Sequence, residues 1–354
     1  MKILFTADPE LPVPPLLYGG VQRLVGTLIE LLRQKGYTIG LVAHCDSMAV
    51  VDYWRPFPVS QSQGKRAVLW NSLALTRAVQ EFKPDVVHSF SRLMYMLPFM
   101  MLPIPKIMCY GRLPTPQPVK LSVKLAGKSL VFGACSQHIG AAGALAAGDW
   151  RVIYNFVELE TYTFVPAVSA DAPLVFLSRI EPIKGAHTAI AIAKACGRRL
   201  LIAGNYSTKG AEGDYWENQI KPQLGKDGIE YVGTVNDQQK NALLGSAAAM
   251  VVPIEWEEPF GIVFAESLAC GTPVISCRRG AVPEIVRHGV DGFVLDPAGD
   301  VVRQGVEAVQ GLDQINRANC RQRVEMNFAA DVILSQYIAL YQELVGVSSG
   351  QKSN

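Results

Sequence analysis

The chain has 354 residues, of which 49% are hydrophobic and 18% charged. At about 100 to 200 residues per domain this length favours two domains, and the apolar fraction excludes disordered and fibrous proteins. The net charge of +2 is unevenly divided: residues 1–165 carry 16 Lys and Arg against 10 Asp and Glu (+6), and residues 166–354 carry 17 against 21 (−4). We therefore expect an anionic partner to bind the first half.

Cysteine usage and hydropathy indicate a reducing compartment. The seven cysteines are widely spaced and form no Cys-x-x-Cys pair, which is typical of free thiols. The most apolar stretch, residues 93–105, holds three prolines and is shorter than the ~20 residues that span a bilayer, and Asp8 interrupts any signal-peptide core. We expect a cytoplasmic protein, with the inner face of the membrane as the alternative. The sequence contains no basic stripe interleaved with aromatic residues, so it does not predict a nucleic-acid partner.

Short apolar runs alternate with amphipathic stretches, which is typical of parallel strands joined by crossover helices. In the first half strands are predicted at residues 3–6, 38–43, 85–89, 106–108, 130–134 and 152–153. The clearest helix is predicted at residues 21–35, before Gly36.

A second series of strands is predicted at residues 174–178, 199–203, 229–232, 249–252, 273–276 and 292–295. A helical segment follows each of them, and a long amphipathic helix is predicted at residues 330–344. Residues 158–173 have weak periodicity and are predicted as a linker. The sequence therefore predicts an α/β protein with two doubly wound, Rossmann-like domains.

The most informative stretch, residues 255–273, follows the predicted strand 249–252. Pro259 and Gly261 suit a turn into a helix that runs to about Cys270. The start of a helix presents unpaired N–H groups and the positive end of the dipole, which favour phosphate at Phe260, Gly261 and Ile262.

Two glutamates flank that helix start. Glu258 lies just before it and Glu266 in its second turn, so both border the same cavity. Carboxylates repel phosphate and accept hydrogen bonds from hydroxyls, so a diphosphate flanked by a sugar and a ribose fits this arrangement. Either glutamate alone would be interpreted as a surface residue.

Two further features follow the first strand of each half. Arg179 and Lys184 follow the strand 174–178, where a pair of cations neutralises a diphosphate without a metal, although either alone would be a solvated charge. Tyr18, Gly19 and Gly20 follow the strand 3–6 after a proline-rich loop, and the glycines allow a ligand to approach the backbone.

Together these stretches resemble the retaining glycosyltransferases of family 4, which have the GT-B fold. Glu258 and Glu266 stand at that family's E-x7-E spacing, Arg179 and Lys184 match its R-x4-K pair, and residues 18–20 match its glycine loop; residues 269–275 and 282–286 match as well. The resemblance covers nearly the whole chain and is strongest over residues 174–297. It implies two domains facing a central crevice: an acceptor-binding domain at residues 1–160, a donor-binding domain at 161–327, and a helix within 328–346 that crosses back to the first domain.

The resemblance implies a retaining transfer of a sugar from a nucleotide-diphosphate sugar to an acceptor hydroxyl, without a metal or other cofactor. By this resemblance, Arg179 and Lys184 bind the diphosphate, Glu258 binds the hydroxyls of the sugar, and Glu266 binds the ribose. The amides of Phe260, Gly261 and Ile262 contact the sugar and phosphate, and Gly19 and Gly20 lie against the phosphate. Thr234 and Val235 border the nucleobase, and His88 lies at the sugar near the acceptor. His88 is singled out from the five histidines because it ends a predicted strand at the crevice. No carboxylate nucleophile is evident, which favours a front-side mechanism.

Several positions depart from the family's pattern, and all lie in the first half or at its end. They are Gln22 for a Glu, Phe90 for a second His, Tyr110 for a His before Gly111, and residues 155–158, Asn-Phe-Val-Glu, for Asn-Gly-Val-Asp. They concern the acceptor more than the donor.

Alternative interpretations stay open. Another GT-B activity, such as a nucleotide-sugar epimerase, and a non-catalytic nucleotide-sugar-binding subunit are the alternative functions. A Rossmann dehydrogenase is disfavoured because no G-x-G-x-x-G follows a strand. Lys120, Lys124 and Lys128 recur every four residues, which predicts a solvated helix face, with peripheral contact at a membrane as the alternative.

Overall fold

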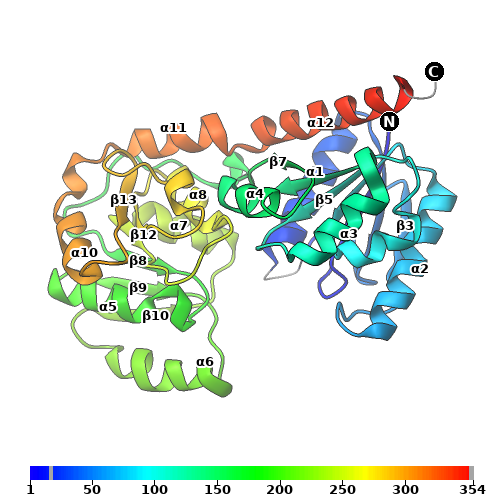
Figure 1. The fold of residues 1–354 in the computed structure, drawn as a ribbon. Coiled ribbons are helices and arrows are strands. Elements are labelled where there is room, and N and C mark those ends of the chain that lie inside the picture. The colour runs from blue at the N-terminus through cyan, green and yellow to red at the C-terminus, as the bar shows by residue number, and fades with distance from the viewer. Residues whose placement is uncertain (16–18, 351–354) are drawn as a thin grey trace. The chain divides into compact units, whose positions relative to one another are not determined.

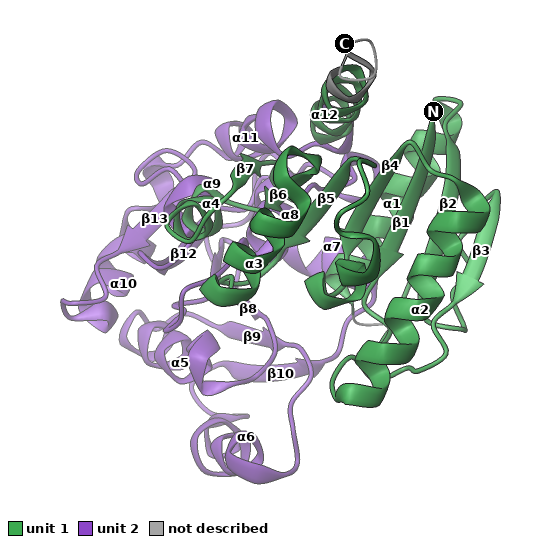
Figure 2. Cartoon of the chain, turned by 45° about the vertical axis from the view of Figure 1, so that its right-hand side comes forward, with its two compact units in different colours: residues 1–155, 333–354 green, residues 156–332 purple. Residues whose placement is uncertain are grey.

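The computed structural model describes residues 1–15 and 19–350, which form two compact units (Figure 2). Unit 1 comprises residues 1–155 and those from Ile333 onward, and unit 2 comprises Phe156–Val332. The chain thus passes between the units at 155/156 and 332/333, whereas the sequence-based boundaries lie at 160/161 and 327/328. Val157 and Ala329 form a bridge with each other within unit 2, so both crossing segments begin in that unit.

Unit 1 contains a parallel sheet, part of which is labelled in Figure 1, and its strands lie in the order β3-β2-β1-β4-β5-β6-β7. Its strands are β1 (Lys2–Ala7), β2 (Thr38–Ala43), β3 (Tyr53–Pro56), β4 (Val86–Phe90), β5 (Lys106–Tyr110), β6 (Leu130–Ala134) and β7 (Asp149–Val152). Its helices are α1 (Gly20–Gln34), α2 (Lys65–Phe82), α3 (Pro116–Ala126), α4 (Gln137–Ala144) and, from Ile333 onward, α12 (Ala330–Gly350).

The two faces of this sheet bury different side chains, because alternate residues of a strand point to opposite faces. Val87 of β4 belongs to a core that α2 and the 3-10 helix Leu93–Phe99 share through residues such as Leu75 and Tyr95. His88, the next residue, contacts α12 on the other face.

Unit 2 contains a second parallel sheet, in the order β10-β9-β8-β11-β12-β13. Its strands are β8 (Leu174–Leu177), β9 (Leu200–Ala203), β10 (Ile229–Gly233), β11 (Ala249–Val251), β12 (Val274–Cys277) and β13 (Gly292–Leu295). Its helices are α5 (Ala186–Ala195), α6 (Gly210–Tyr215), α7 (Asp237–Ser246), α8 (Ile262–Ala269), α9 (Val282–Ile285), α10 (Val301–Gln310) and α11 (Arg317–Asn327). Helix α5 packs beside α10, and α8 packs beside α7 and α11.

Most predicted strands are present to within one or two residues, and the exceptions have local causes. Strand β3 was not predicted, because it is a four-residue edge strand that ends at Pro56 and has no apolar run. Strand β7 lies at Asp149–Val152 rather than at 152–153, since the polar residues Asp149 and Arg151 mask it in the hydropathy pattern. Within the described residues no helix is both long and apolar enough to cross a membrane.

Candidate functional site

The predicted donor residues of unit 2 follow neighbouring strands of its sheet. Arg179 comes two residues after β8, and Glu258 lies in the segment between β11 and α8. Strands β8 and β11 are hydrogen-bonded neighbours, and the chain order of the sheet reverses between them. Ligands of open α/β sheets bind at the carboxyl ends of the strands at such a reversal, so these residues occupy the expected position.

Lys184 and Glu258 form a buried ion pair. The Lys184 Nζ lies 2.6 Å from Glu258 Oε2, and the two side chains are only 10% and 11% exposed. Trp256 joins them: its Nε1–H donates to the same oxygen at 2.9 Å, and the ammonium lies 4.5 Å from the centre of its ring. Among the described residues Glu258 Oε1 accepts no hydrogen bond, so one carboxylate oxygen is left for a ligand.

Close backbone packing fixes the position of Glu258. Its carbonyl accepts a hydrogen bond from the Ala281 amide at 2.8 Å, and a side chain at Gly280 would overlap its backbone. Gly261 precedes α8 with a φ of 79°, and a side chain there would overlap the ring of Phe264. The glycine is therefore required for the turn into α8, which begins at Ile262, shortly after Glu258.

Arg179 is held beside the same strand end. Its guanidinium pairs with the buried Glu181 and is 38% exposed. Because part of this guanidinium is exposed, an anion can approach it. Lys184 ends the short 3-10 helix Pro182–Lys184 that follows, which brings both predicted cations to one end of β8.

Glu266 accepts two short hydrogen bonds through one oxygen. The Tyr162 hydroxyl donates to Glu266 Oε1 at 2.7 Å, and Lys240 Nζ of α7 donates at 2.6 Å. Burial and the charge of Glu266 raise the pKa of Tyr162, so this tyrosine stays a donor. Among the described residues Oε2 accepts no hydrogen bond, so it is available to a ligand.

The predicted nucleobase loop follows β10. Thr234 is exposed and Val235 half-buried, and Asn236 then starts α7 with a capping box that includes Gln239. Lys240, one turn into α7, connects this loop to Glu266. The structure thus brings the residues after β10 and the α8 glutamate together.

The glycine loop of unit 1 is described only in part. Tyr18 lies outside the described residues. Gly19 has a φ of 150° and Gly20 is the first residue of α1, which shows that the pair opens this helix as predicted from its position.

His88 does not lie at an open strand end, and this part of the prediction is wrong. Strand β4 continues to Phe90, and the His88 ring is fully buried. Its Nδ1 lies 2.7 Å from the Tyr341 hydroxyl of α12 and its Nε2 lies 3.0 Å from Cys109 Sγ. Burial lowers its pKa to about 3, so the ring is neutral. His88 fastens α12 to the sheet and cannot touch a substrate in this structure.

The three lysines near α3 do not share one helix. Lys120 and Lys124 are exposed residues of α3, which ends at Ala126, whereas Lys128 belongs to the 3-10 turn that follows. Gly127 has a φ of 56° and stops the helix between them. The predicted continuous basic face is therefore shorter than expected.

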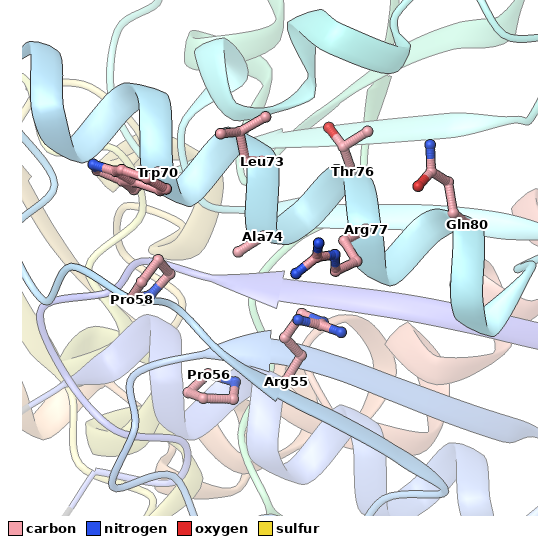
Figure 3. A pocket seen from close by; sticks show the side chains of 9 residues that line it. All are labelled: Arg55, Pro56, Pro58, Trp70, Leu73, Ala74, Thr76, Arg77 and Gln80. Carbon is pink, nitrogen blue, oxygen red and sulfur yellow. The ribbon is translucent and has the colours of Figure 1, made fainter.

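A separate pocket of about 480 Å³ lies between β3 and α2 (Figure 3). Trp70 and Leu73 of α2 form its apolar wall, and Arg55 and Arg77 add two guanidinium groups. None of the predicted site residues lines it. It lies on the outer strand of unit 1, away from the point where the strand order of that sheet reverses.

Four residues of the unit 2 site were missed by the sequence reasoning: Trp256, Glu181, Tyr162 and Lys240. Trp256 and Glu181 lie inside the motifs that were recognised, so their closeness to Glu258 and Arg179 was available as a signal. Tyr162 and Lys240 are 104 and 26 residues from Glu266 and carry no local signal.

Comparison with known proteins identifies similar sequences over both units. Two family models match, "Glycosyl transferases group 1" over residues 165–312 and "Glycosyltransferase Family 4" over residues 18–113. A D-inositol 3-phosphate glycosyltransferase of Mycobacterium marinum is 33% identical over 146 residues, which are 40% of this chain and 30% of that protein. An N-acetyl-alpha-D-glucosaminyl L-malate synthase of Bacillus anthracis is 25% identical over 215 residues, 56% and 54% of the two chains. The chain thus spans about a third to a half of these relatives.

Solved structures share the fold over nearly the full chain. A sucrose-phosphate synthase of Thermosynechococcus elongatus has a TM-score of 0.80 at 20% identity and covers 98% of this chain and 100% of that one. Anabaena HepE in complex with UDP and glucose has a TM-score of 0.73 at 20% identity, with 96% and 99% covered. The two parallel sheets and these neighbours confirm the predicted α/β fold class.

Proposed function

Because the chain belongs to the family 4 glycosyltransferases, which have the GT-B fold, we propose that it transfers a sugar from a nucleotide-diphosphate sugar to an acceptor hydroxyl group. The observation that carries this proposal is the Lys184–Glu258 pair at the carboxyl ends of β8 and β11. There, a cation that can bind a phosphate donates a hydrogen bond to a carboxylate that can bind sugar hydroxyls. UDP in the HepE complex makes a uridine nucleotide the first donor to test.

The diphosphate binds the cations of unit 2 in this proposal. Arg179 offers a fork of N–H donors, and Lys184 offers a compact charge, which it shares with Glu258 until the phosphate arrives. The amides of Phe260, Gly261 and Ile262 add donors at the start of α8. Cations and amides together supply the charge stabilisation that a metal supplies elsewhere, so we propose a reaction without a metal or other cofactor.

The two glutamates recognise hydroxyl groups through their free oxygens. Glu258 Oε1 accepts from the transferred sugar, while Lys184 and Trp256 hold Oε2. Glu266 Oε2 accepts from the ribose, while Tyr162 and Lys240 hold Oε1. Thr234 and Val235 border the nucleobase, and Gly19 and Gly20 approach the phosphate; these roles rest on the resemblance.

The transfer proceeds with retention through a front-side mechanism. The bond from the anomeric carbon to the phosphate oxygen breaks, the acceptor oxygen bonds to the same face of that carbon, and the leaving phosphate takes the acceptor's proton. The protein then positions both substrates and stabilises the phosphate charge. His88 is excluded from these steps by its burial and acts as a structural residue.

The test is calorimetric titration of the full chain with UDP, GDP, ADP and dTDP in chelator, followed by transfer assays with the matching glucose donor. We expect one nucleotide to bind, Lys184→Ala to weaken it at least tenfold, and Lys221→Ala, an exposed cation elsewhere in unit 2, to leave it unchanged. A folded protein that binds none of the four would contradict the proposal. Binding without any transfer or donor hydrolysis would favour a non-catalytic subunit instead.

The place of the enzyme in the cell is a separate prediction. We propose a cytoplasmic enzyme; contact with the inner face of the membrane through α3, where Lys120 and Lys124 are exposed beside Leu121 and Leu125, is the alternative. Sedimentation with vesicles that contain anionic lipid tests this contact. Loss of binding in Lys120→Glu with Lys124→Glu is the expected result, and binding that ignores this change would contradict it.

A further inference from the structure

Two arginines of unit 1 lie where its parallel sheet would hold a ligand. Arg92 comes two residues after β4, and Arg112 two residues after β5. These strands are neighbours, and β1, which Asp8 follows directly, lies beside β4. Because parallel strands end at the same edge, all three side chains start from one edge of the sheet. The strand order reverses between β1 and β4, which is the expected position of a ligand.

Neither arginine has a carboxylate partner in the part of the chain that the structure describes. Among residues 1–15 and 19–350 no carboxylate oxygen lies within 4.0 Å of either guanidinium. Arg92 donates one hydrogen bond, to Ser62 Oγ at 2.7 Å, while its Nε is buried without a partner. Arg112 is exposed, and none of the described residues accepts a hydrogen bond from its side chain. A guanidinium has five N–H donors, so most donors of this pair are unused.

Two carboxylates, Asp8 and Glu10, belong to the same region of unit 1 as the two arginines. Burial raises the pKa of Asp8, whereas the charges of Arg92 and Arg112 both act to lower it. Asp8 Oδ1 accepts a hydrogen bond from the Glu10 amide at 3.3 Å. Glu10 in turn accepts from the hydroxyl of Ser62 and from its amide. Local donors thus engage both carboxylates, and neither forms a salt bridge with an arginine.

We propose that the acceptor carries an anionic group, a phosphate ester or a carboxylate, which binds between Arg92 and Arg112. Either anion matches the fork of a guanidinium with two parallel hydrogen bonds. Arg92 is preorganised, because Ser62 fixes one of its terminal nitrogens, and Arg112 closes on the ligand from its exposed position. This inference rests on the proposed function, since it names the acceptor class for that reaction, and it assigns acceptor choice to two residues of unit 1.

The experiment compares anionic sugars and polyols with their neutral parents. The probes are glucose 6-phosphate, glucuronate and glucose, and glycerol 3-phosphate and glycerol, titrated calorimetrically into the full chain with and without UDP. We expect at least one anionic probe to bind at least tenfold more tightly than its parent. Glucose 6-phosphate and glucuronate distinguish a phosphate from a carboxylate.

Three variants assign the binding to the arginines. Arg112→Ala removes an exposed side chain and should fold normally, and it should weaken the anionic probe at least tenfold. Arg92→Lys keeps a charge but loses the fork, and it should weaken the same probe. Lys120→Ala removes an exposed cation of α3 and serves as the control. The affinity for UDP should not change in any of them.

The outcomes separate this inference from the proposed function. Three results would overturn the anionic acceptor, whether or not a nucleotide binds. They are equal affinity for anionic and neutral probes, an affinity for the anionic probe that neither arginine variant changes, and no binding of any anionic probe to a folded protein. Binding of an anionic probe that depends on Arg92 and Arg112, in a protein that binds no nucleotide, would support the anion site and contradict the proposed function.

Discussion

The carboxyl ends of the two sheets hold their charges in opposite ways. In unit 2 the charged residues are already paired, Lys184 with Glu258 and Lys240 with Glu266. In unit 1 Arg92 and Arg112 have no carboxylate partner among the described residues, and the predicted His88 is buried in the sheet. A ligand of unit 2 must exchange partners with an internal pair, whereas a ligand of unit 1 meets open donors.

The largest effect is expected from breaking the pair in unit 2. Lys184→Ala and Glu258→Ala should each lower kcat about 10²- to 10³-fold, because in the proposed function each removes a group that binds the reacting sugar or phosphate. Each variant also leaves a partner charge buried without compensation, which costs about 3 to 5 kcal/mol of unfolding free energy. Transfer assays and urea unfolding measure the two effects.

The matched control is Glu258→Gln, which keeps an acceptor for Trp256 but removes the charge. We expect a smaller loss of stability than in Glu258→Ala and a comparable loss of activity. Normal turnover in either alanine variant would contradict the assignment of the site.

The next effect concerns the hydrogen-bond framework around Arg317, which supports unit 2, the unit that holds the Lys184–Glu258 pair. Arg317 of α11 is buried and donates to the carbonyls of Val165, Gly245 and Ala247 and to the Thr272 hydroxyl. Arg317→Met should lower the unfolding free energy of unit 2 by about 3 kcal/mol, because unsatisfied buried acceptors cost about 1 to 3 kcal/mol each. Thermal unfolding measures the loss.

If the framework only supports the site, UDP affinity at low temperature should be unchanged in Arg317→Met. A loss of affinity in a fully folded sample would show that the preorganisation of unit 2 depends on this arginine, and would sharpen its contrast with unit 1.

A smaller effect tests the structural role of His88. Its folded pKa of about 3 lies below the usual value of 6.5, so the folded state favours the neutral ring. The stabilisation is complete above pH 6.5 and is lost as the pH falls from 6.5 toward 3, by about 1.4 kcal/mol per pH unit for this group. Urea unfolding at pH 7 and pH 5 should show a drop that His88→Leu lacks.

The rate profile gives an independent readout of the same residue. We expect kcat to show no ionisation that His88→Gln removes. An ionisation near pH 6 to 7 that disappears in this variant would return His88 to the reacting groups.

The proposed donor site in unit 2 was predictable from the sequence to a greater extent than the proposed acceptor site in unit 1. Arg179, Lys184, Glu258 and the start of α8 were predicted from motif spacing and from their positions after predicted strands, because local patterns define the ends of β8 and β11. The partners Tyr162 and Lys240 were not predictable, since tertiary packing brings them to Glu266 from distant segments. The prediction that His88 lies at an open strand end failed for the same reason, because Tyr341, which covers it, is 253 residues away in the sequence.

The smallest effect compares two attachments of α12 to the sheet of unit 1. Arg151 of β7 pairs with Glu343 at 2.7 Å, but the side chains are 38% and 46% exposed. Glu343→Gln should therefore change the unfolding free energy by less than about 1 kcal/mol. Tyr341→Phe removes the buried hydroxyl beside His88 and should cost about 1 to 3 kcal/mol. Equal effects would contradict this ranking.

The bridge between Val157 and Ala329 has a consequence for how the protein forms during synthesis. Unit 2 is one uninterrupted segment, and the isolated bridge between Val157 and Ala329 joins its two ends, so in the chain order it is inserted into unit 1. The ribosome delivers all of unit 2 before Tyr337 and Tyr341, which cover His88, have emerged. Unit 2 can therefore complete its folding while unit 1 still lacks α12, so unit 1 is the last of the two to form its final contacts.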